Sequence, residues 1–312
     1  MRIVSLLPSA TDIVVALGAS HELVGVSHSC SGDWNHLPKL TSTWVDTSAC
    51  AAQIDTQVTT ATRPLYQLDI DTLAALEPDV VISQSLCDVC AVPVGDVREA
   101  VLTLESQPVL VDMAPNGLDD VPVCFDQAGA AIGRVKEAGA LIRQWHDTFE
   151  RYRGVHADKD LEIAFLDWMN PQFIAGHRVP EMVEKLGLTN CLGQAREPSF
   201  KVTWEAINAA QPDLLVSACC GFGVDQAERE AAPVDCPVIH QDGHLQFSRP
   251  SPALMPSLKM LSEAIGTHCA QPDFAANLPE YTLCQRSPAQ AGGPPIRKPF
   301  SYSPLLCLIR RP

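Results

Sequence analysis

Basic residues are scarce in this chain. Only 22 of its 312 residues are Lys or Arg, against 37 Asp or Glu, and the formal net charge is −15. Nucleic-acid backbones and anionic bilayers are themselves negative, so such a surface repels both. We therefore expect neither as a partner.

Long apolar runs are also missing. No stretch reaches the roughly 18 to 20 apolar residues that a membrane helix needs, so no membrane span is predicted. The chain passes from Met1 and Arg2 directly into the apolar run 3–7, which is too short for a secretory signal. As the sequence stands, this favours a cytoplasmic monomer. In that compartment, twelve Cys are expected as reduced thiols or metal ligands rather than as disulfides.

Common catalytic signatures are absent. The sequence has no Gly-rich phosphate loop, no G-x-S-x-G elbow and no H-E-x-x-H, so hydrolase, kinase and zincin mechanisms lack their parts. We predict a protein that is not an enzyme.

What the chain does contain is a repeat. Residues 68–83 align without a gap on residues 202–217, which lie 134 positions later. Each copy has apolar residues at helical spacing, then a Pro that forbids continuation of the helix, then an apolar run of strand length. The sequence therefore predicts two similar lobes.

Other segments support an α/β fold. Strand patterns at 3–7, 24–27, 109–112, 161–168 and 237–240 alternate with helical ones at 13–17, 179–186 and 251–265, which is typical of parallel sheets covered on both faces. Residues 119–152 have apolar side chains three and four apart, which predicts one long helix that reaches from one lobe to the other. We expect an N-terminal lobe at 1–118, a linking helix at 119–156, a C-terminal lobe at 157–270 and a disordered tail at 271–312.

Five motifs give the chain a resemblance to a known family over residues 2–266. They are R-I-V-S-L-L-P-S-A-T (2–11), L-V-G-V-S-H (23–28), L-C-D-V-C-A-V (86–92), G-H-R-V-P-E-M-V (176–183) and F-S-R-P (247–250). The combination resembles the cobalamin-binding branch of the periplasmic binding proteins for vitamin B12 and ferric chelates, the substrate-binding proteins of ABC transporters.

The resemblance implies two Rossmann-like lobes joined by one rigid helix, with a ligand cleft between them. It implies a corrinoid ligand such as cobalamin, or a related chelated metal, and an ABC-transporter permease as a partner. Asp71 and Glu205 match the carboxylates through which each lobe docks on the permease; solvated acids at two helix starts are the alternative. Family members are often periplasmic or anchored in the envelope.

The chain departs from the family pattern in three places. The export leader of transport members is not seen, and the tail has no counterpart. Only sixteen residues separate Cys220 from Pro237, where relatives fit an additional helix, so we expect a trimmed second lobe.

Loops at the carboxyl ends of the strands are expected to face the cleft. They are Ser9, His28 with Cys30, 84–90, 168–177, 219–222 and 242–247. A flat tetrapyrrole-like ligand needs aromatic faces, polar groups for its fringe and in some cases an axial ligand. The predicted cofactor-binding residues are Ser9, His28, Cys30, Trp44, Gln84, Trp168, Phe173, His177, Phe222 and Phe247.

The grounds for predicting these site residues differ from one residue to another. Trp44 matches a pocket Trp of the B12-carrying relatives, whereas Gln84 and Ser199 stand where those relatives have aromatic residues. The other aromatic residues fit ordinary core packing equally well. His28 and His177 are candidates to ligate cobalt, iron or zinc.

The alternative function rests on thiols. Cys87 and Cys90 form a C-x-x-C, and with His28 and Cys30 they would give a soft four-ligand site for zinc or iron. A thiol-redox couple and an ordinary reduced pair remain open as further interpretations.

Overall fold

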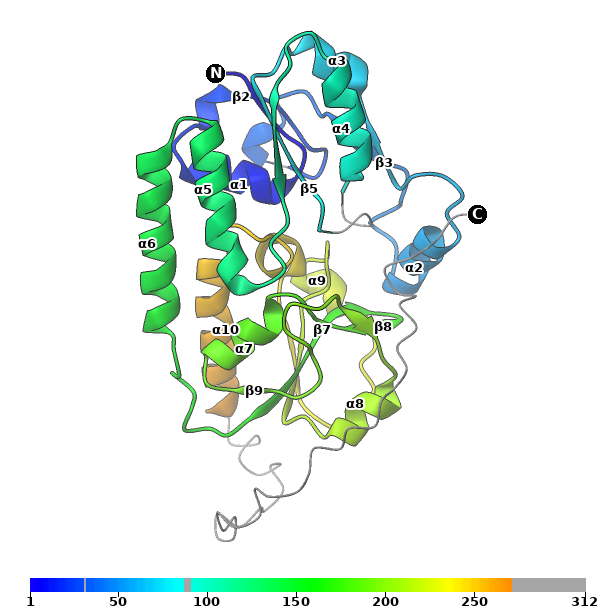
Figure 1. Cartoon of the computed structure of the whole chain (residues 1–312). Helices are drawn as coiled ribbons and strands as arrows, with labels where there is room; N and C mark the ends of the chain where they lie inside the picture. Colours follow the sequence, from blue (N-terminus) through cyan, green and yellow to red (C-terminus); the bar gives the residue numbers. More distant parts are fainter. Residues whose placement is uncertain (31, 87–90, 271–312) are drawn as a thin grey trace. The chain divides into compact units, whose positions relative to one another are not determined.

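The computed structural model describes residues 1–30, 32–86 and 91–270 (Figure 1). The chain divides into two compact units, Met1–Ser262 and Glu263–Pro312. All three sheets of the described residues lie in the first unit. The tail predicted as disordered, 271–312, lies outside the described residues.

The first sheet is entirely parallel, as predicted. Its strand order is β2-β1-β5-β6, from Leu23–Val26, Ile3–Ser5, Val80–Gln84 and Val109–Met113. Because side chains alternate along an extended chain, Val4 of β1 and Leu6 just after it join one apolar cluster with Leu73 and Val97. The helices of this lobe are α1 (Pro8–Ala16), α3 (Ile70–Ala75), α4 (Val94–Thr103) and α5 (Val121–Ala131).

The second sheet is mixed. Strands β7 (Glu162–Met169), β11 (Leu214–Ser217) and β12 (Val238–His240) are parallel neighbours, and β9 (Thr189–Asn190) also pairs with β7. Strands β8 (Gln172–Ile174) and β10 (Phe200–Lys201) extend it antiparallel. The loop expected at 168–177 therefore contains a strand. The helices are α7 (Val179–Lys185), α8 (Trp204–Ala210), α9 (Val224–Ala227) and α10 (Leu254–Cys269).

The repeat is confirmed at the level of single residues. Helices α3 and α8 begin after Asp69 and Thr203, and each of these side chains accepts a hydrogen bond from the amide three residues later. Asp79 and Asp213 occupy matching positions after the helices. Each accepts from the amide at the start of the neighbouring strand, on Arg2 and Glu162 respectively, and donates its own amide back to that residue.

The predicted linking helix is two helices rather than one. Helix α5 ends at Ala131 and α6 runs from Val135 to Arg151. Between them, Gly133 takes a positive φ of 69°, which glycine adopts without a Cβ clash, and the chain reverses so that the helices lie side by side (Figure 1). The apolar spacing continues across this turn, which is why periodicity alone predicted one helix.

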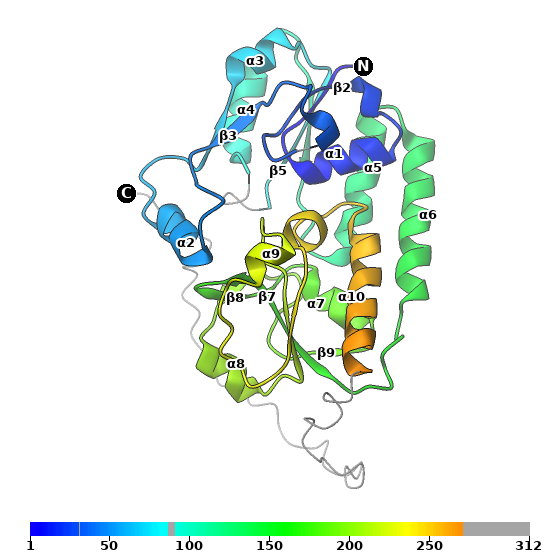
Figure 2. The same ribbon diagram turned by 180° about the vertical axis from the view of Figure 1, so that it is seen from behind.

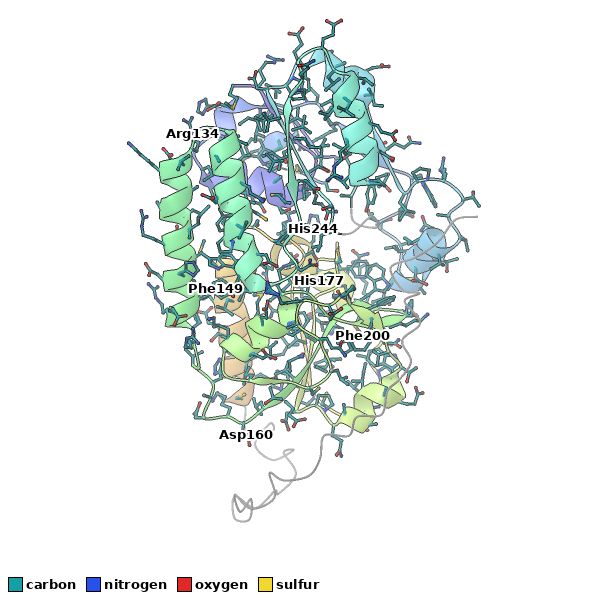
Figure 3. The ribbon with its side chains drawn as sticks, in the orientation of Figure 1. Arg134, Phe149, Asp160, His177, Phe200 and His244 are labelled. Carbon is teal, nitrogen blue, oxygen red and sulfur yellow. The ribbon has the colours of Figure 1, made fainter. Side chains whose placement is uncertain are left out.

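Helix α6 supplies the link between the lobes. At its start Arg134 pairs with Glu22 of the first lobe at 2.5 Å, and near its end Glu150 meets Lys185 of the second lobe at 3.5 Å. Trp145, Phe125 and Phe149 pack against one another along it. Figure 3 shows Arg134 and Phe149 toward opposite ends of this helix.

A hairpin arm leaves the first lobe between β2 and β5. Strands β3 (Thr41–Thr43) and β4 (Tyr66–Leu68) pair antiparallel, and helix α2 (Ala51–Thr59) lies between them in sequence. Short 3-10 turns cover Ser20–Glu22, Gly32–Trp34 and Leu118–Asp120, and a π-helical turn covers Gly243–Phe247. Among the described residues, none of the helices has the length and apolar content to cross a bilayer.

Candidate functional site

The carboxyl edge of the first sheet forms a narrow hollow. Segments following β1, β2 and β5 meet there with the hairpin arm. The lining residues are Leu6, Leu7, Pro8, Ser27, His28, Ser29, Thr41, Tyr66, Ala91 and Val92. Three strand ends therefore converge on His28, as expected for neighbouring parallel strands.

His28 is held by the arm. Its Nδ1 lies 2.6 Å from Thr41 Oγ1, its Nε2 lies 3.2 Å from Ser29 Oγ, and its ring lies 5.8 Å from that of Tyr66. Burial, and then the charge of Lys39, lowers the His28 pKa. A neutral imidazole is the form that ligates metals, but here both ring nitrogens are engaged.

Cys30 turns away from this hollow. Its side chain is buried and its Sγ lies 3.3 Å from Thr11 Oγ1. Burial raises the Cys30 pKa, which disfavours the thiolate that binds metal. The described ranges contain no group of three or more His, Cys, Asp or Glu placed to hold a metal ion. Cys87 and Cys90 lie outside the described residues, so the four-ligand site stays a prediction.

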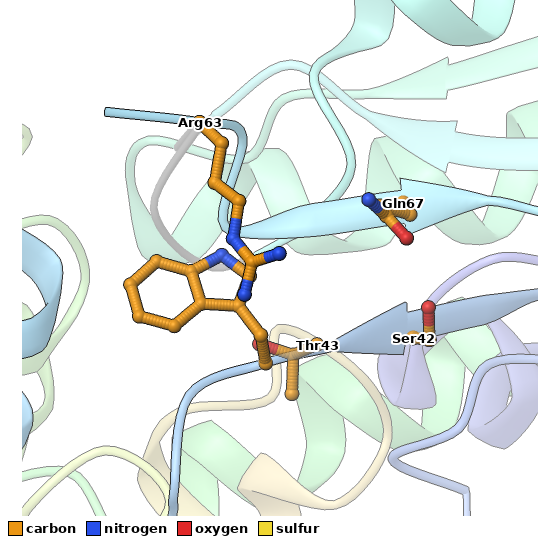
Figure 4. Close-up of a pocket in the computed structure, with 5 residues that line it drawn as sticks. Ser42, Thr43, Arg63 and Gln67 are labelled. Carbon is orange, nitrogen blue, oxygen red and sulfur yellow. The ribbon is translucent and has the colours of Figure 1, made fainter. Parts of the chain in front are cut away.

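Trp44 lines a second hollow, on the arm itself (Figure 4). Its Nε1 donates to the carbonyl of Pro64 at 2.9 Å, and the Arg63 guanidinium lies 4.8 Å from its ring centroid. Ser42 and Gln67, which pair across the two strands, line the same hollow. Thr41 lines the His28 hollow instead, so the two hollows lie at different positions along the arm.

Ser9 and Gln84 are less accessible than their predicted role requires. Helix α1 begins at Pro8, so Ser9 lies within it and is buried. Gln84 is buried at the end of β5, where its Oε1 accepts the amide of Leu86 at 2.7 Å. Neither residue lines the His28 hollow.

At the carboxyl edge of the second sheet, the predicted aromatic residues form part of the core. The Trp168 and Phe222 rings lie 5.0 Å apart, and Phe222 is fully buried. Phe247 packs edge-on against Phe165, with centroids 5.1 Å apart, and is buried too. Trp168 and Phe173 are half-buried, so they are the members with surface left for a ligand.

His177 lies in a sharp turn at this edge. Its φ is 51°, and its amide and carbonyl bond to Glu197 and Arg196 across the turn. Burial, and then the charge of Arg178, lowers the His177 pKa to about 4. The imidazole is therefore neutral at physiological pH.

Beside His177 lies a carboxylate network whose members the sequence did not pair with each other. The side chain of Asp167, at the end of β7, accepts a hydrogen bond from Ser199 Oγ, and Ser199 Oγ in turn accepts the amide of Gly176 at 3.1 Å. Burial raises the Asp167 pKa to about 6. The available signal was the polar Asp167 at the end of an apolar strand; its partner Ser199 is 32 residues away.

Asp71 and Glu205 are exposed in the first turns of α3 and α8. A hydrogen bond from its own backbone amide, followed by one from Thr203, lowers the Glu205 pKa. Both positions are therefore free to meet a partner, one from each copy of the repeat.

Neither hollow can hold a tetrapyrrole as it stands. The Trp44 hollow has a volume of about 80 Å³ and the His28 hollow about 10 Å³, whereas ligand pockets are typically ~300–1,000 Å³. A ligand of that size therefore exceeds the space in either hollow.

Comparisons with known proteins agree on one family. A family model described as periplasmic binding protein matches residues 3–233. No curated protein matches the chain.

Solved structures share the fold at low sequence identity. The periplasmic heme-binding protein RhuT of Roseiflexus sp. RS-1, in apo form, is 21% identical with a TM-score of 0.60, covering 89% of this chain and 99% of that one. The periplasmic vitamin B12 binding protein BtuF of Vibrio cholerae is 17% identical, with a TM-score of 0.58 and coverages of 86% and 98%. A protein of an ABC-type Fe3+-hydroxamate transport system from Saccharomonospora viridis DSM 43017 is 17% identical, with a TM-score of 0.58 and coverages of 85% and 93%.

Proposed function

The chain belongs to the periplasmic binding protein family, and from this we propose that it binds a chelated-metal ligand between its lobes and hands it to an ABC-transporter permease. The family consists of substrate-binding proteins, so the activity is binding without turnover. The observation that carries the proposal is the convergence of the β1, β2 and β5 ends on the His28 hollow, because ligands of open α/β sheets bind at the carboxyl ends of the strands.

The ligand class follows from the similar structures. Their names refer to heme, vitamin B12 and Fe3+-hydroxamate, which are all metal chelates. We propose a corrinoid as the specific ligand, with Trp44, Trp168 and Phe173 against its faces and His28 or His177 as the axial ligand. Ser9, Cys30, Gln84, Phe222 and Phe247 would act one layer behind, since they are buried in the described conformation.

Permease docking is the second half of this role. Asp71 and Glu205 present one exposed carboxylate from each lobe at matching positions of the repeat. A pair of arginines on the permease would bind them as charge-assisted pairs. This role would place the protein on the periplasmic side, where its family is named to act, rather than in the cytoplasm.

Absorbance titration tests the binding proposal. Purified protein is mixed with hydroxocobalamin, haemin or a ferric hydroxamate, and the spectrum of the chelate is followed. We expect a saturable shift with one of the three, and His28→Ala should weaken it or move the band if His28 ligates the metal. The matched control is His21→Ala, because His21 is 71% exposed. No saturable shift with any of the three would contradict the proposal.

A further inference from the structure

The two sides of the hairpin arm, residues 41–68, are held together next to its base. Strands β3 and β4 pair at its base. Just beyond them, the Trp44 indole donates to the Pro64 carbonyl and stacks with Arg63. Residues 44 and 63–64 precede and follow α2, so these contacts hold the two ends of the helical segment together. Residues 44–64 therefore form one compact segment, the head of the arm, which carries α2.

The head packs into the core of the other lobe. Ala51 and Ile54 of α2 are buried, and they belong to one apolar cluster with residues of the second sheet. That sheet contributes Ala164, Leu166 and Leu215. Val45, Ala49 and Val58 of the arm pack against the same cluster. The apolar face of α2 is thus buried by the second lobe, although the strands that flank α2 in sequence belong to the arm of the first lobe.

Polar contacts tie the same head to α9 and the residues that follow it. The amide of Ala51 donates to Glu230 Oε1 at 2.8 Å. Gln226 Nε2 donates to the carbonyls of Thr47 at 3.2 Å and Ala49 at 3.1 Å. Glu230 therefore satisfies an amide at the start of α2, which has no partner within the helix.

The second lobe needs this cover. Only sixteen residues separate Cys220 from Pro237, and the helix they contain, α9, has four residues. A short helix cannot shield the sheet face formed by Ala164, Leu166 and Leu215, and an exposed apolar face is costly. Ile207 of α8 covers part of this cluster, and Ala51 and Ile54 of α2 cover a further part.

The arm and the linking helices lie on opposite sides of the two sheets. Figures 1 and 2 both show α5 and α6 on one side and α2 on the other. On the linker side, Asp120 pairs with Arg196 at 2.8 Å. A linker on one side and a detachable contact on the other is the arrangement of a hinge with a catch.

We propose that α2 is a clasp: it completes the core of the second lobe, and its release is the step that lets the two lobes separate. The clasp contacts are independent of what the protein binds. The further claim, that a ligand enters only after this release, rests on the proposed function.

Hydrogen–deuterium exchange of the ligand-free protein tests the clasp. The variant is Gln226→Ala with Glu230→Ala, which removes the polar contacts and leaves the apolar core untouched. We expect amide exchange in α2 to rise about a hundredfold, since three hydrogen bonds are removed and the net contribution of each is about 1 kcal/mol. Gln226→Ala with Glu230→Gln should restore part of the protection, because an amide oxygen can still accept from Ala51. The matched control is Glu228→Ala, an exposed acid two residues away.

A stronger variant tests lobe separation. Ile54→Asp puts a charge into the shared cluster, and we expect a larger radius of gyration by small-angle X-ray scattering. Thr56→Asp, at an exposed position of the same helix, should change nothing. The clasp is overturned if α2 exchange in the double variant equals that of Glu228→Ala. It is also overturned if Ile54→Asp stays folded by circular dichroism with an unchanged radius.

Stopped-flow mixing with hydroxocobalamin separates the clasp from the binding function. Faster association in the double variant is expected if release precedes entry. If no variant binds hydroxocobalamin while the exchange and scattering results hold, the clasp stands and the corrinoid proposal fails. Association at the unaltered rate in a variant with released α2 overturns the gating role.

Discussion

The two copies of the repeat share their local structure but differ in the length of chain that precedes them within each lobe. In both, a capped helix is followed by a residue with positive φ, Glu77 at 41° and Gln211 at 50°, and then by an Asp that brackets the neighbouring strand. Val80 lies 77 residues after its partner Ile3, whereas Leu214 lies 51 residues after Ile163. The additional residues between the paired strands of the first lobe are close in number to those of the arm, residues 41–68. The first lobe thus carries a segment that the second lobe uses.

The strand ends differ in chemistry as well. By register along the paired strands, Leu7 in the first lobe corresponds to Asp167 in the second. Leu7 is buried against the His28 hollow, while Asp167 accepts from Ser199. Equivalent backbone positions therefore carry an apolar residue in the first lobe and a titratable one in the second.

The largest expected effect comes from the matching core residues Leu73 and Ile207. Both are fully buried, so Leu73→Ala and Ile207→Ala should each lower the free energy of unfolding by about 2–5 kcal/mol. Urea unfolding followed by circular dichroism measures this. Asp71→Ala, exposed on the first of these helices, is the control and should change it by less than about 0.5 kcal/mol. A small loss for Ile207→Ala alone would show that the second copy does not support its lobe as the first does.

Much of this symmetry could be predicted from the sequence because it is local. Helix caps, the Pro that ends each helix and the buried strands depend on neighbouring residues, and the aligned segments 68–83 and 202–217 showed all of them. The turn at Gly133 was also visible as a glycine after a helical run, a common stop signal, but continuing periodicity outweighed it.

The docking of α2 could not be predicted in the same way. The spacing of Ala51, Ile54 and Val58 shows an apolar face, but not which sheet covers it. The site residues also divide into those that a local signal placed and those that only long-range pairing placed. Strand ends predicted that His28 would lie at the sheet edge, whereas Thr41 as its partner, and Ser199 as the partner of Asp167, come from pairings that only the fold brings together.

The second prediction concerns pH and the carboxyl group of Asp167 at the rim of the second lobe. The Asp167 pKa is raised from 3.8 to about 6, so the native state holds this proton more tightly than the unfolded chain. The free energy of unfolding should therefore fall as pH rises from about 4 to about 6, by roughly 2 kcal/mol. Asp167→Asn keeps an acceptor for Ser199 but cannot titrate, so its urea midpoints should lose this component of the slope. Parallel curves for the variant and the unaltered protein would refute the assignment.

A third, smaller effect tests the two caps. Asp69 and Thr203 each accept an amide hydrogen bond at the start of their helix, at 2.9 and 3.2 Å. Replacement of either by Ala should lower the free energy of unfolding by about 1 kcal/mol. Asp69→Asn and Thr203→Ser retain the acceptor and serve as controls in the same urea experiment. If Asp69→Ala and Asp69→Asn lose the same amount, the cap is not the cause.

The smallest effect should have the opposite sign. Glu77 and Gln211 adopt positive φ at the ends of matching helices, a conformation that costs a residue with a Cβ more than it costs glycine. Glycine is favoured at such helix ends, so Glu77→Gly and Gln211→Gly should raise the free energy of unfolding by about 0.5 kcal/mol, after the entropy that glycine loses on folding is subtracted. Thermal unfolding detects this as a higher Tm, with Gln107→Gly as a further positive-φ control outside the repeat. If only one of the two matching positions gains stability, their backbone strain is not equivalent, and the symmetry of the copies ends at the capped helices.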